Sequence, residues 1–190
     1  MHAEALAQAL AGRGALLDGH FRLSSGRHSD RFVQKFRILE DPTIVEEIAK
    51  TLATHARALA PTVVVSAAVG GIVLGYEVAR QLGLKAIFVE KEDGVPSLRR
   101  GFALGADDRA FVVEDVMTTG GSVREVLRVI AERGARTAGV GVIVRRQPSD
   151  FGVATVALLD LPVVSYDPAD CPQCRRGEPT TEPGSRFLAK

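Results

Sequence analysis

Residues 110–125 read AFVVEDVMTTGGSVRE, and this stretch decides the fold. Its apolar, β-branched beginning predicts a strand that is buried on both faces. Two carboxylates, Glu114 and Asp115, end that run and are followed by hydroxyl residues and glycines. Ser122 and Glu125 have the spacing of a capping box, so we expect a helix to begin there. A strand, a polar turn and a helix in succession are typical of a βαβ unit.

The same alternation of short apolar runs and amphipathic segments extends over the middle of the chain. Asp41 followed by Pro42 predicts the start of a helix, and a second helix is predicted over Gly71–Leu82, before Gly83. We therefore predict an α/β fold with a central, mainly parallel sheet flanked by helices and joined by right-handed crossovers. Further strands are predicted over residues 62–67, 86–90, 139–144 and 153–159.

Two segments do not follow this alternation. Gly19–Phe36 is polar with interleaved aromatics, which predicts an irregular or antiparallel addition. After Leu161 the chain becomes rich in proline, and we expect an ordered loop without regular helix. We expect a single domain over residues 1–190, with a core over about 41–160 and a small hood built from about 15–40 and 160–190.

Composition limits the classes of function. The 190 residues are 46% hydrophobic and carry a formal net charge of +1. A soluble domain of this size buries roughly 70% of its unfolded surface. The balanced charge argues against nucleic-acid wrapping, which needs a basic footprint. With neither a secretory signal nor a membrane span in the sequence, we expect a cytoplasmic protein without nucleic-acid or membrane partners.

The cysteine content is small. Cys171 and Cys174 form one CxxC, which is half of a four-ligand zinc site. Two further ligands would have to come from elsewhere, for example from another chain. We therefore favour structural thiols or a local pair of cysteines over a zinc knuckle.

The turn after residues 110–114 has the composition of a ligand site. In open parallel sheets, ligands bind beyond the carboxyl ends of the strands. Thr118–Ser122 offers hydroxyls, glycines and helix N-terminal amides, which together suit a phosphate. The neighbouring Glu114 and Asp115 suit sugar hydroxyls or a cation. The turn therefore predicts a pocket for a ribose 5-phosphate, and the alternative is a helix start with no ligand.

Residues 114–122 resemble the phosphoribosyl-diphosphate signature of the phosphoribosyltransferases. Residues 19–30, 68–72 and 145–147 are similar to segments of the orotate branch of that family. This resemblance covers essentially the whole chain and implies a type I-like phosphoribosyltransferase fold. It implies transfer of ribose 5-phosphate from phosphoribosyl diphosphate to N1 of orotate, which yields orotidine 5′-monophosphate and diphosphate for UMP biosynthesis. Mg²⁺ is the implied cofactor, bound mainly through the substrate.

The resemblance also implies a role for individual residues. Glu114 and Asp115 would hold the ribose hydroxyls, and with Lys91 they are the expected catalytic residues. Arg146 would grip the orotate carboxylate, unless it is a solvated strand end. The expected orotate contacts are Thr118, Arg146, Ser24 and Phe32, of which Phe32 is equally well explained as a core aromatic. The expected phosphoribosyl-diphosphate contacts are Val69, Gly70, Gly71, Lys91, Glu114, Asp115, Val116, Met117, Thr118, Thr119, Gly120, Gly121 and Ser122.

Residues 91–101 are expected to form a mobile loop that closes over the site. The resemblance implies that the loop is shared across the subunits of a homodimer, with Lys91 on the diphosphate. Arg99 and Arg100 either help Lys91 or lie on the return strand. Of the histidines, His28 is a candidate contact, whereas His2, His20 and His55 are expected at the surface or in local hydrogen bonds.

Two other functions are compatible with the same pocket. A phosphoribosyltransferase for another base would share residues 114–122 but differ in its hood. A regulator that senses phosphoribosyl diphosphate and binds nucleic acid should show surplus Lys and Arg, which this chain lacks. No Ser-His-Asp or Cys-His constellation is evident in the sequence, so catalysis would depend on positioning and leaving-group stabilisation.

Overall fold

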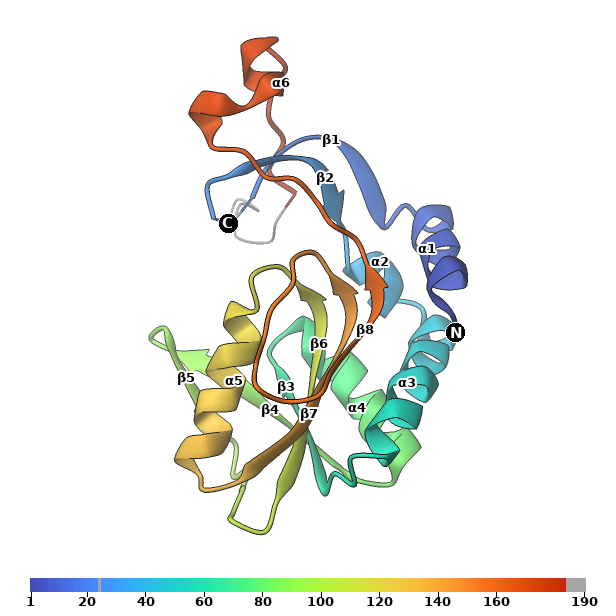
Figure 1. Cartoon of the computed structure of the whole chain (residues 1–190), viewed down its shortest axis with the longest axis vertical. Coiled ribbons are helices and arrows are strands. Elements are labelled where there is room, and N and C mark those ends of the chain that lie inside the picture. The colour runs from blue at the N-terminus through green and yellow to red at the C-terminus, as the bar shows by residue number, and fades with distance from the viewer. Residues whose placement is uncertain (24, 184–190) are drawn as a thin grey trace.

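The computed structural model of this chain describes residues 1–23 and 25–183. Within them, a central sheet has the strand order β5-β4-β3-β6-β7-β8 (Figure 1). Its strands run parallel, except that β5 is antiparallel to β4. The α/β fold and all five predicted strands are confirmed. The strands are β3 Val63–Ala67, β4 Lys85–Glu92, β5 Val95–Leu98, β6 Arg109–Met117, β7 Arg136–Arg145 and β8 Thr155–Asp160.

Helices cover both faces of this sheet. In Figure 1, α5 lies on one face, and α3 and α4 lie on the other. The predicted start of α3 is confirmed, because Asp41 Oδ1 accepts hydrogen bonds from the backbone amides of Thr43 and Ile44. The helices are α1 Ala3–Gly12, α2 Phe36–Leu39, α3 Pro42–Arg57, α4 Gly70–Leu82 and α5 Gly121–Glu132.

The sheet is buried on both sides, as its near-continuous apolar strands predict. Val64 packs into a hydrophobic cluster with α1, α3 and α4, whereas its neighbours Val63 and Val65 pack into a second cluster with α5. Alternate residues of one strand point to opposite faces, so every position of such a strand is apolar. Packing of the two clusters holds the strands in place, and the candidate site lies at the carboxyl ends of these strands.

A small second layer lies over the carboxyl ends of the parallel strands. The strands β1 Leu16–Arg22 and β2 His28–Val33 form an antiparallel hairpin, as the polar segment predicts (Figure 1). The described part of the tail lies against this hairpin, and backbone hydrogen bonds join His28 to Tyr166 and His20 to Thr181. The segments predicted to form a hood therefore lie together.

Three local expectations were wrong. The N-cap of α5 is Gly120, so Ser122 and Glu125 form no capping box, and Glu125 instead accepts from Lys91. The tail contains two single helical turns, η1 Pro168–Asp170 and α6 Pro172–Arg175. Both turns begin with proline, whose fixed φ suits a first helical position. His20, expected at the surface or in a local hydrogen bond, is buried with an exposed fraction of 5%.

Candidate active site

The predicted phosphate turn lines a pocket at the carboxyl end of β6. The pocket holds about 340 Å³ of open space. Thr118, Thr119, Gly121 and Ser122 are exposed there, so their hydroxyls and amides face the solvent. The lining residues are Glu114, Val116, Met117, Thr118, Thr119, Gly120, Gly121, Ser122 and Val123. The sequence therefore identified nearly the whole lining of this pocket.

The two adjacent carboxylates have different surroundings. Asp115 is 1% exposed, and its carboxylate is paired with Lys35, whose Nζ lies 2.8 Å from Oδ2 and 3.0 Å from Oδ1. The backbone amide of Val116 also donates to Asp115 Oδ1 over 2.6 Å. Asp115 is not among the residues that line the pocket. Its carboxylate instead joins β6 to the segment that leads into α2.

Glu114 faces the pocket and is buried without a cation of its own. Burial is the main cause that raises the pKa of Glu114 above its ordinary value, and the negative charge of Asp115 adds to it. Glu114 Oε1 accepts a 3.0 Å hydrogen bond from the amide of Asp115, and this bond favours the charged form. Because burial and repulsion outweigh this bond, Glu114 holds its proton to a higher pH than an exposed glutamate does.

The predicted diphosphate loop precedes α4. Gly70 must be a glycine, because a Cβ at this position would overlap Asp115 Oδ2 and would lie 2.7 Å from Lys35 Nζ. The first amides of a helix have no partner within that helix, so α4 presents donors here. The amide of Ala68, just before this loop, is already used, since it donates to the carbonyl of Val89. Because Gly70 and Gly71 have no side chains, a diphosphate could approach the backbone of the loop Val69–Gly71 closely.

The phosphate turn itself is held from behind. Gly120 has φ +78°, and a Cβ there would lie 2.7 Å from Phe151 Cζ. The carbonyl of Thr119 accepts from Arg124 Nη1 over 2.6 Å and from Ser149 Oγ over 3.3 Å. These contacts hold the turn in one conformation before any ligand binds.

Arg146 is a buried cation beside this turn. Its side chain is 8% exposed, and Nε has no hydrogen-bond partner among the described residues. Burial lowers the pKa of Arg146 from its ordinary value. The amide of Arg146 donates to the carbonyl of Met117 over 2.8 Å, which places this residue next to the pocket. A buried guanidinium with an unused donor is suited to bind an anion.

Most of residues 91–101, expected to form a mobile loop, belong to the antiparallel β4–β5 hairpin, and Arg99 and Arg100 follow the end of β5. Strands β4 and β5 pair through Lys91 and Pro96, so the return strand begins at Val95. Each cation of this hairpin meets a carboxylate in the structure. Lys91 pairs with Glu125 at 2.7 Å, and the two arginines, Arg99 and Arg100, pair at 2.9 Å with Glu92 and Glu90 respectively.

Two expected orotate contacts belong to the β1–β2 region. Phe32 lies on β2 and is half-buried, with its ring 5.8 Å from the ring of Phe21. This contact accounts for Phe32 as a packing residue and leaves its role toward a ligand untested. Ser24 lies outside the described residues.

Comparison with known proteins identifies the relatives of this chain. The phosphoribosyl transferase domain model matches residues 36–152. An orotate phosphoribosyltransferase of Pelotomaculum thermopropionicum is 50% identical over 92% of this chain and 93% of that protein. The chain belongs to the orotate phosphoribosyltransferase family. Another relative of that name, from Desulforamulus reducens, is 44% identical over 99% of this chain and 100% of its own length.

Solved structures of the orotate phosphoribosyltransferase family have the same fold. The crystal structure of the Aeropyrum pernix orotate phosphoribosyltransferase has a TM-score of 0.70 and 28% identity, and the match covers 82% of this chain and 93% of that one. The predicted fold class is therefore confirmed. None of the helices described here combines the length and the apolar character needed to cross a membrane.

Sequence reasoning missed one feature of the site and one side-chain cluster outside it. Lys35 was not proposed, although it provides the cation of Asp115. It precedes a helix of only one turn and has no charged motif around it, so its spatial neighbour 80 residues away left no local signal. The grouping of His20 with the cysteines was also missed, because the ligands come from distant segments.

Proposed function

We propose that this chain transfers ribose 5-phosphate from phosphoribosyl diphosphate to N1 of orotate and releases diphosphate. The observation that carries the choice of orotate is Arg146, a buried guanidinium next to Met117 of the phosphate pocket, whose Nε has no hydrogen-bond partner within residues 1–23 and 25–183. A planar carboxylate is the anion that matches a guanidinium best. The curated relatives with 44–50% identity are named orotate phosphoribosyltransferase, which favours orotate over other bases.

In this proposal, the 5′-phosphate binds to the exposed turn Thr118–Ser122 at the start of α5. Glu114 and Asp115 hold the ribose hydroxyls, and the amides of Val69–Gly71 take the diphosphate. The rigid support of the turn by Phe151 and Arg124 favours this, because a site that is already formed loses little entropy on binding.

Orotate in this proposal lies between Arg146 and the hood, with Thr118 at its edge. The hood consists of the β1–β2 hairpin and the tail, within a single domain of residues 1–190. Ser24 and Phe32 would contact the base from this side. The hairpin lies over the carboxyl ends of the strands, which is the edge of the sheet where the turn Thr118–Ser122 follows β6, and this position supports the arrangement (Figure 1).

Mg²⁺ is the cofactor that we propose. The donors in the site fit a metal carried by the substrate, because Asp115 is already paired with Lys35 and Glu114 is buried. Diphosphate and ribose oxygens are hard ligands of the kind that Mg²⁺ prefers. When bound, the metal neutralises charge on the departing diphosphate.

We propose a homodimer in which the hairpin of residues 91–101 acts in the partner's site. The support is an exposed apolar stripe on α4, where Val69, Val73 and Tyr76 have exposed fractions of 72%, 49% and 66%. These residues recur at helical spacing, so they share one face. Lys91 would exchange Glu125 for the diphosphate when the hairpin closes.

We place the enzyme in the cytoplasm, because its polyanionic substrate does not cross membranes unaided.

One assay tests the reaction. The protein is incubated with phosphoribosyl diphosphate, Mg²⁺ and orotate, and the loss of orotate absorbance is followed with diphosphate release. We expect orotate to be consumed, and a reaction without phosphoribosyl diphosphate serves as the control. Consumption of uracil, adenine or hypoxanthine with orotate untouched would show that the choice of base is wrong.

A further inference from the structure

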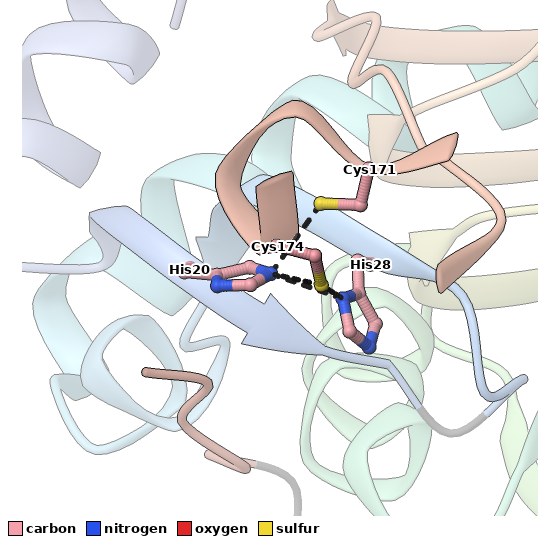
Figure 2. A group of neighbouring side chains, drawn as sticks. All are labelled: His20, His28, Cys171 and Cys174. Atoms are coloured by element: carbon pink, nitrogen blue, oxygen red, sulfur yellow. Dashed lines mark hydrogen bonds between the residues drawn. The ribbon is translucent and has the colours of Figure 1, made fainter. Parts of the chain in front are cut away.

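Four side chains with metal-binding atoms meet where the tail lies on the β1–β2 hairpin (Figure 2). His20 lies in β1, and His28 begins β2. Cys171 and Cys174 lie at the start and in the middle of the single turn α6. The ligand atoms of all four residues lie within 4.8 Å of one another. This cluster is separate from the phosphate pocket and has no part in the proposed reaction.

Four of the six distances between the ligand atoms are close to those of a tetrahedral zinc site. Zn–S bonds of about 2.3 Å and Zn–N bonds of about 2.05 Å place sulfur and nitrogen about 3.5 Å apart, and two nitrogens about 3.3 Å apart. In the structure, His20 Nε2 lies 3.4 Å from Cys171 Sγ and 3.7 Å from Cys174 Sγ. His28 Nδ1 lies 3.2 Å from Cys174 Sγ and 3.0 Å from His20 Nε2. One ion at the centre therefore reaches these donors with small movements.

The contact of His20 Nδ1 determines that Nε2 is the nitrogen that points into the cluster. His20 Nδ1 lies 2.9 Å from the carbonyl oxygen of Glu178, which can only accept a hydrogen bond. Nδ1 therefore carries the proton, and the lone pair of Nε2 points at the two sulfurs. A carbonyl behind a ligating histidine is the usual means of orienting such a ring.

Burial and exposure also suit a structural metal. Cys171 is fully buried, and His20 and His28 have exposed fractions of 5% and 7%, so three of the donors are removed from water. Cys174 is exposed and leaves a route by which an ion reaches the cluster. A cluster of four protein donors leaves no open position for a substrate, which is the arrangement of structural rather than catalytic zinc.

We propose that this cluster is a zinc site in which His20 Nε2, His28 Nδ1, Cys171 Sγ and Cys174 Sγ bind one Zn²⁺ tetrahedrally. Two thiolates and two imidazoles form a donor set that favours zinc over the hard cations Mg²⁺ and Ca²⁺. The ion would join the two ends of the chain. An isolated two-stranded hairpin is marginally stable in water, so this link would hold the hood in place.

The first experiment uses the full-length chain purified under reducing conditions. We expect about one zinc per chain by elemental analysis. After exchange for Co²⁺, we expect the visible bands of tetrahedral cobalt together with a thiolate-to-cobalt charge-transfer band. Absence of bound metal from the wild-type chain, or a cobalt spectrum without the thiolate band, would overturn the proposal. A disulfide between Cys171 and Cys174 under these conditions would overturn it as well.

Variants and thiol chemistry complete the test. We expect Cys174→Ser and His28→Ala to lose stoichiometric zinc, whereas His55→Ala, an exposed histidine of α3, keeps it as the matched control. If the variants do not fold, the wild-type chain still tests the proposal. Removal of zinc from the wild-type chain by a chelator should increase the rate at which both thiols react with Ellman's reagent and should lower the melting temperature. Equal thiol reactivity with and without chelator contradicts the proposal. None of these measurements depends on catalytic activity.

Discussion

Single residues in this site differ in how their charge is compensated. Asp115 has Lys35 at 2.8 Å, whereas its neighbour Glu114 is buried with no cation of its own and Arg146 is buried with a free Nε. Unpaired buried groups of this kind are costly to the folded state and are common at functional sites. The two uncompensated side chains, Glu114 and Arg146, are therefore places where substitution should separate binding from stability.

Arg146→Ala is expected to weaken orotate binding selectively. Loss of a charge-assisted hydrogen bond costs about 1.5–3 kcal/mol, which raises the KM for orotate roughly 10- to 150-fold. Steady-state kinetics with both substrates varied measure this change. Arg145→Ala is the matched control, because Arg145 already pairs with Asp160. Equal losses for orotate and phosphoribosyl diphosphate would indicate misfolding instead.

Lys91→Ala is expected to lower kcat far more than it changes the KM for orotate. A cation that meets the leaving diphosphate acts mainly in the transition state, and loss of such a contact costs on the order of 10²-fold in rate. Kinetics at saturating substrate measure the effect. Lys85→Ala, an exposed lysine at the other end of β4, serves as the control. An unchanged kcat would remove Lys91 from the mechanism.

The raised pKa of Glu114 predicts a pH-dependent stability. Above the ordinary carboxyl pKa of about 4.3, the unfolded chain releases this proton while the folded chain keeps it. Stability is therefore fully present at low pH and falls as pH rises toward the folded pKa, by up to about 1.4 kcal/mol per unit. Glu114→Gln should flatten this fall in urea unfolding between acidic and neutral pH. Glu132→Gln, an exposed site, should leave the fall unchanged.

At the scale of elements, the sequence predicted what depends on local pattern. The strands and α3 follow from apolar runs and from the cap at Asp41, and the phosphate turn follows from one contiguous motif. The cap of α5 was misassigned, since Gly120 adopts φ +78° and takes the N-cap position two residues before Ser122. Lys35 and the histidine–cysteine cluster could not be predicted, because their partners lie 80 or more residues away.

Gly120→Ala is expected to destabilise the chain more than Gly83→Ala. Both glycines have positive φ, which costs a Cβ about 1–2 kcal/mol, but a Cβ at Gly83 meets open space while one at Gly120 meets Phe151. The crowding should add about 1–3 kcal/mol to the loss at Gly120. The free energies of unfolding in urea measure the difference. Equal losses would show that Phe151 moves aside without cost.

At the scale of the whole molecule, the near-zero net charge is compatible with anionic substrates. In the proposed function, the positive charge that attracts the substrates is local: it lies at Arg146 and at the backbone amides that begin α4 and α5, and the cations of the β4–β5 hairpin add to it only once they leave their carboxylates. The exposed cations of this hairpin are neutralised by carboxylates in the structure. A charge distribution of this kind is compatible with a polyanion binding at one place rather than along the whole surface.

Tyr76→Lys is expected to convert the proposed dimer to a monomer. A charge at position 76 of the apolar stripe must be buried at the interface without a partner, which is costly. Light scattering after size exclusion measures the mass. Thr54→Lys on α3 is the control, because that side chain is exposed outside the stripe. A monomeric wild-type chain would contradict the proposed assembly.

The pairing of the two chain ends has a consequence for biosynthesis. Backbone hydrogen bonds join His20 to Thr181 and His28 to Tyr166. The β1–β2 hairpin is therefore synthesised early, but the tail segment that pairs with it is synthesised late. While the ribosome adds the intervening residues, the sheet from β3 to β8 can form from neighbouring segments. The second layer formed by this hairpin and the tail is therefore assembled only when translation is nearly finished. A nascent chain that stops before Tyr166 would carry residues 118–122 without the complete second layer.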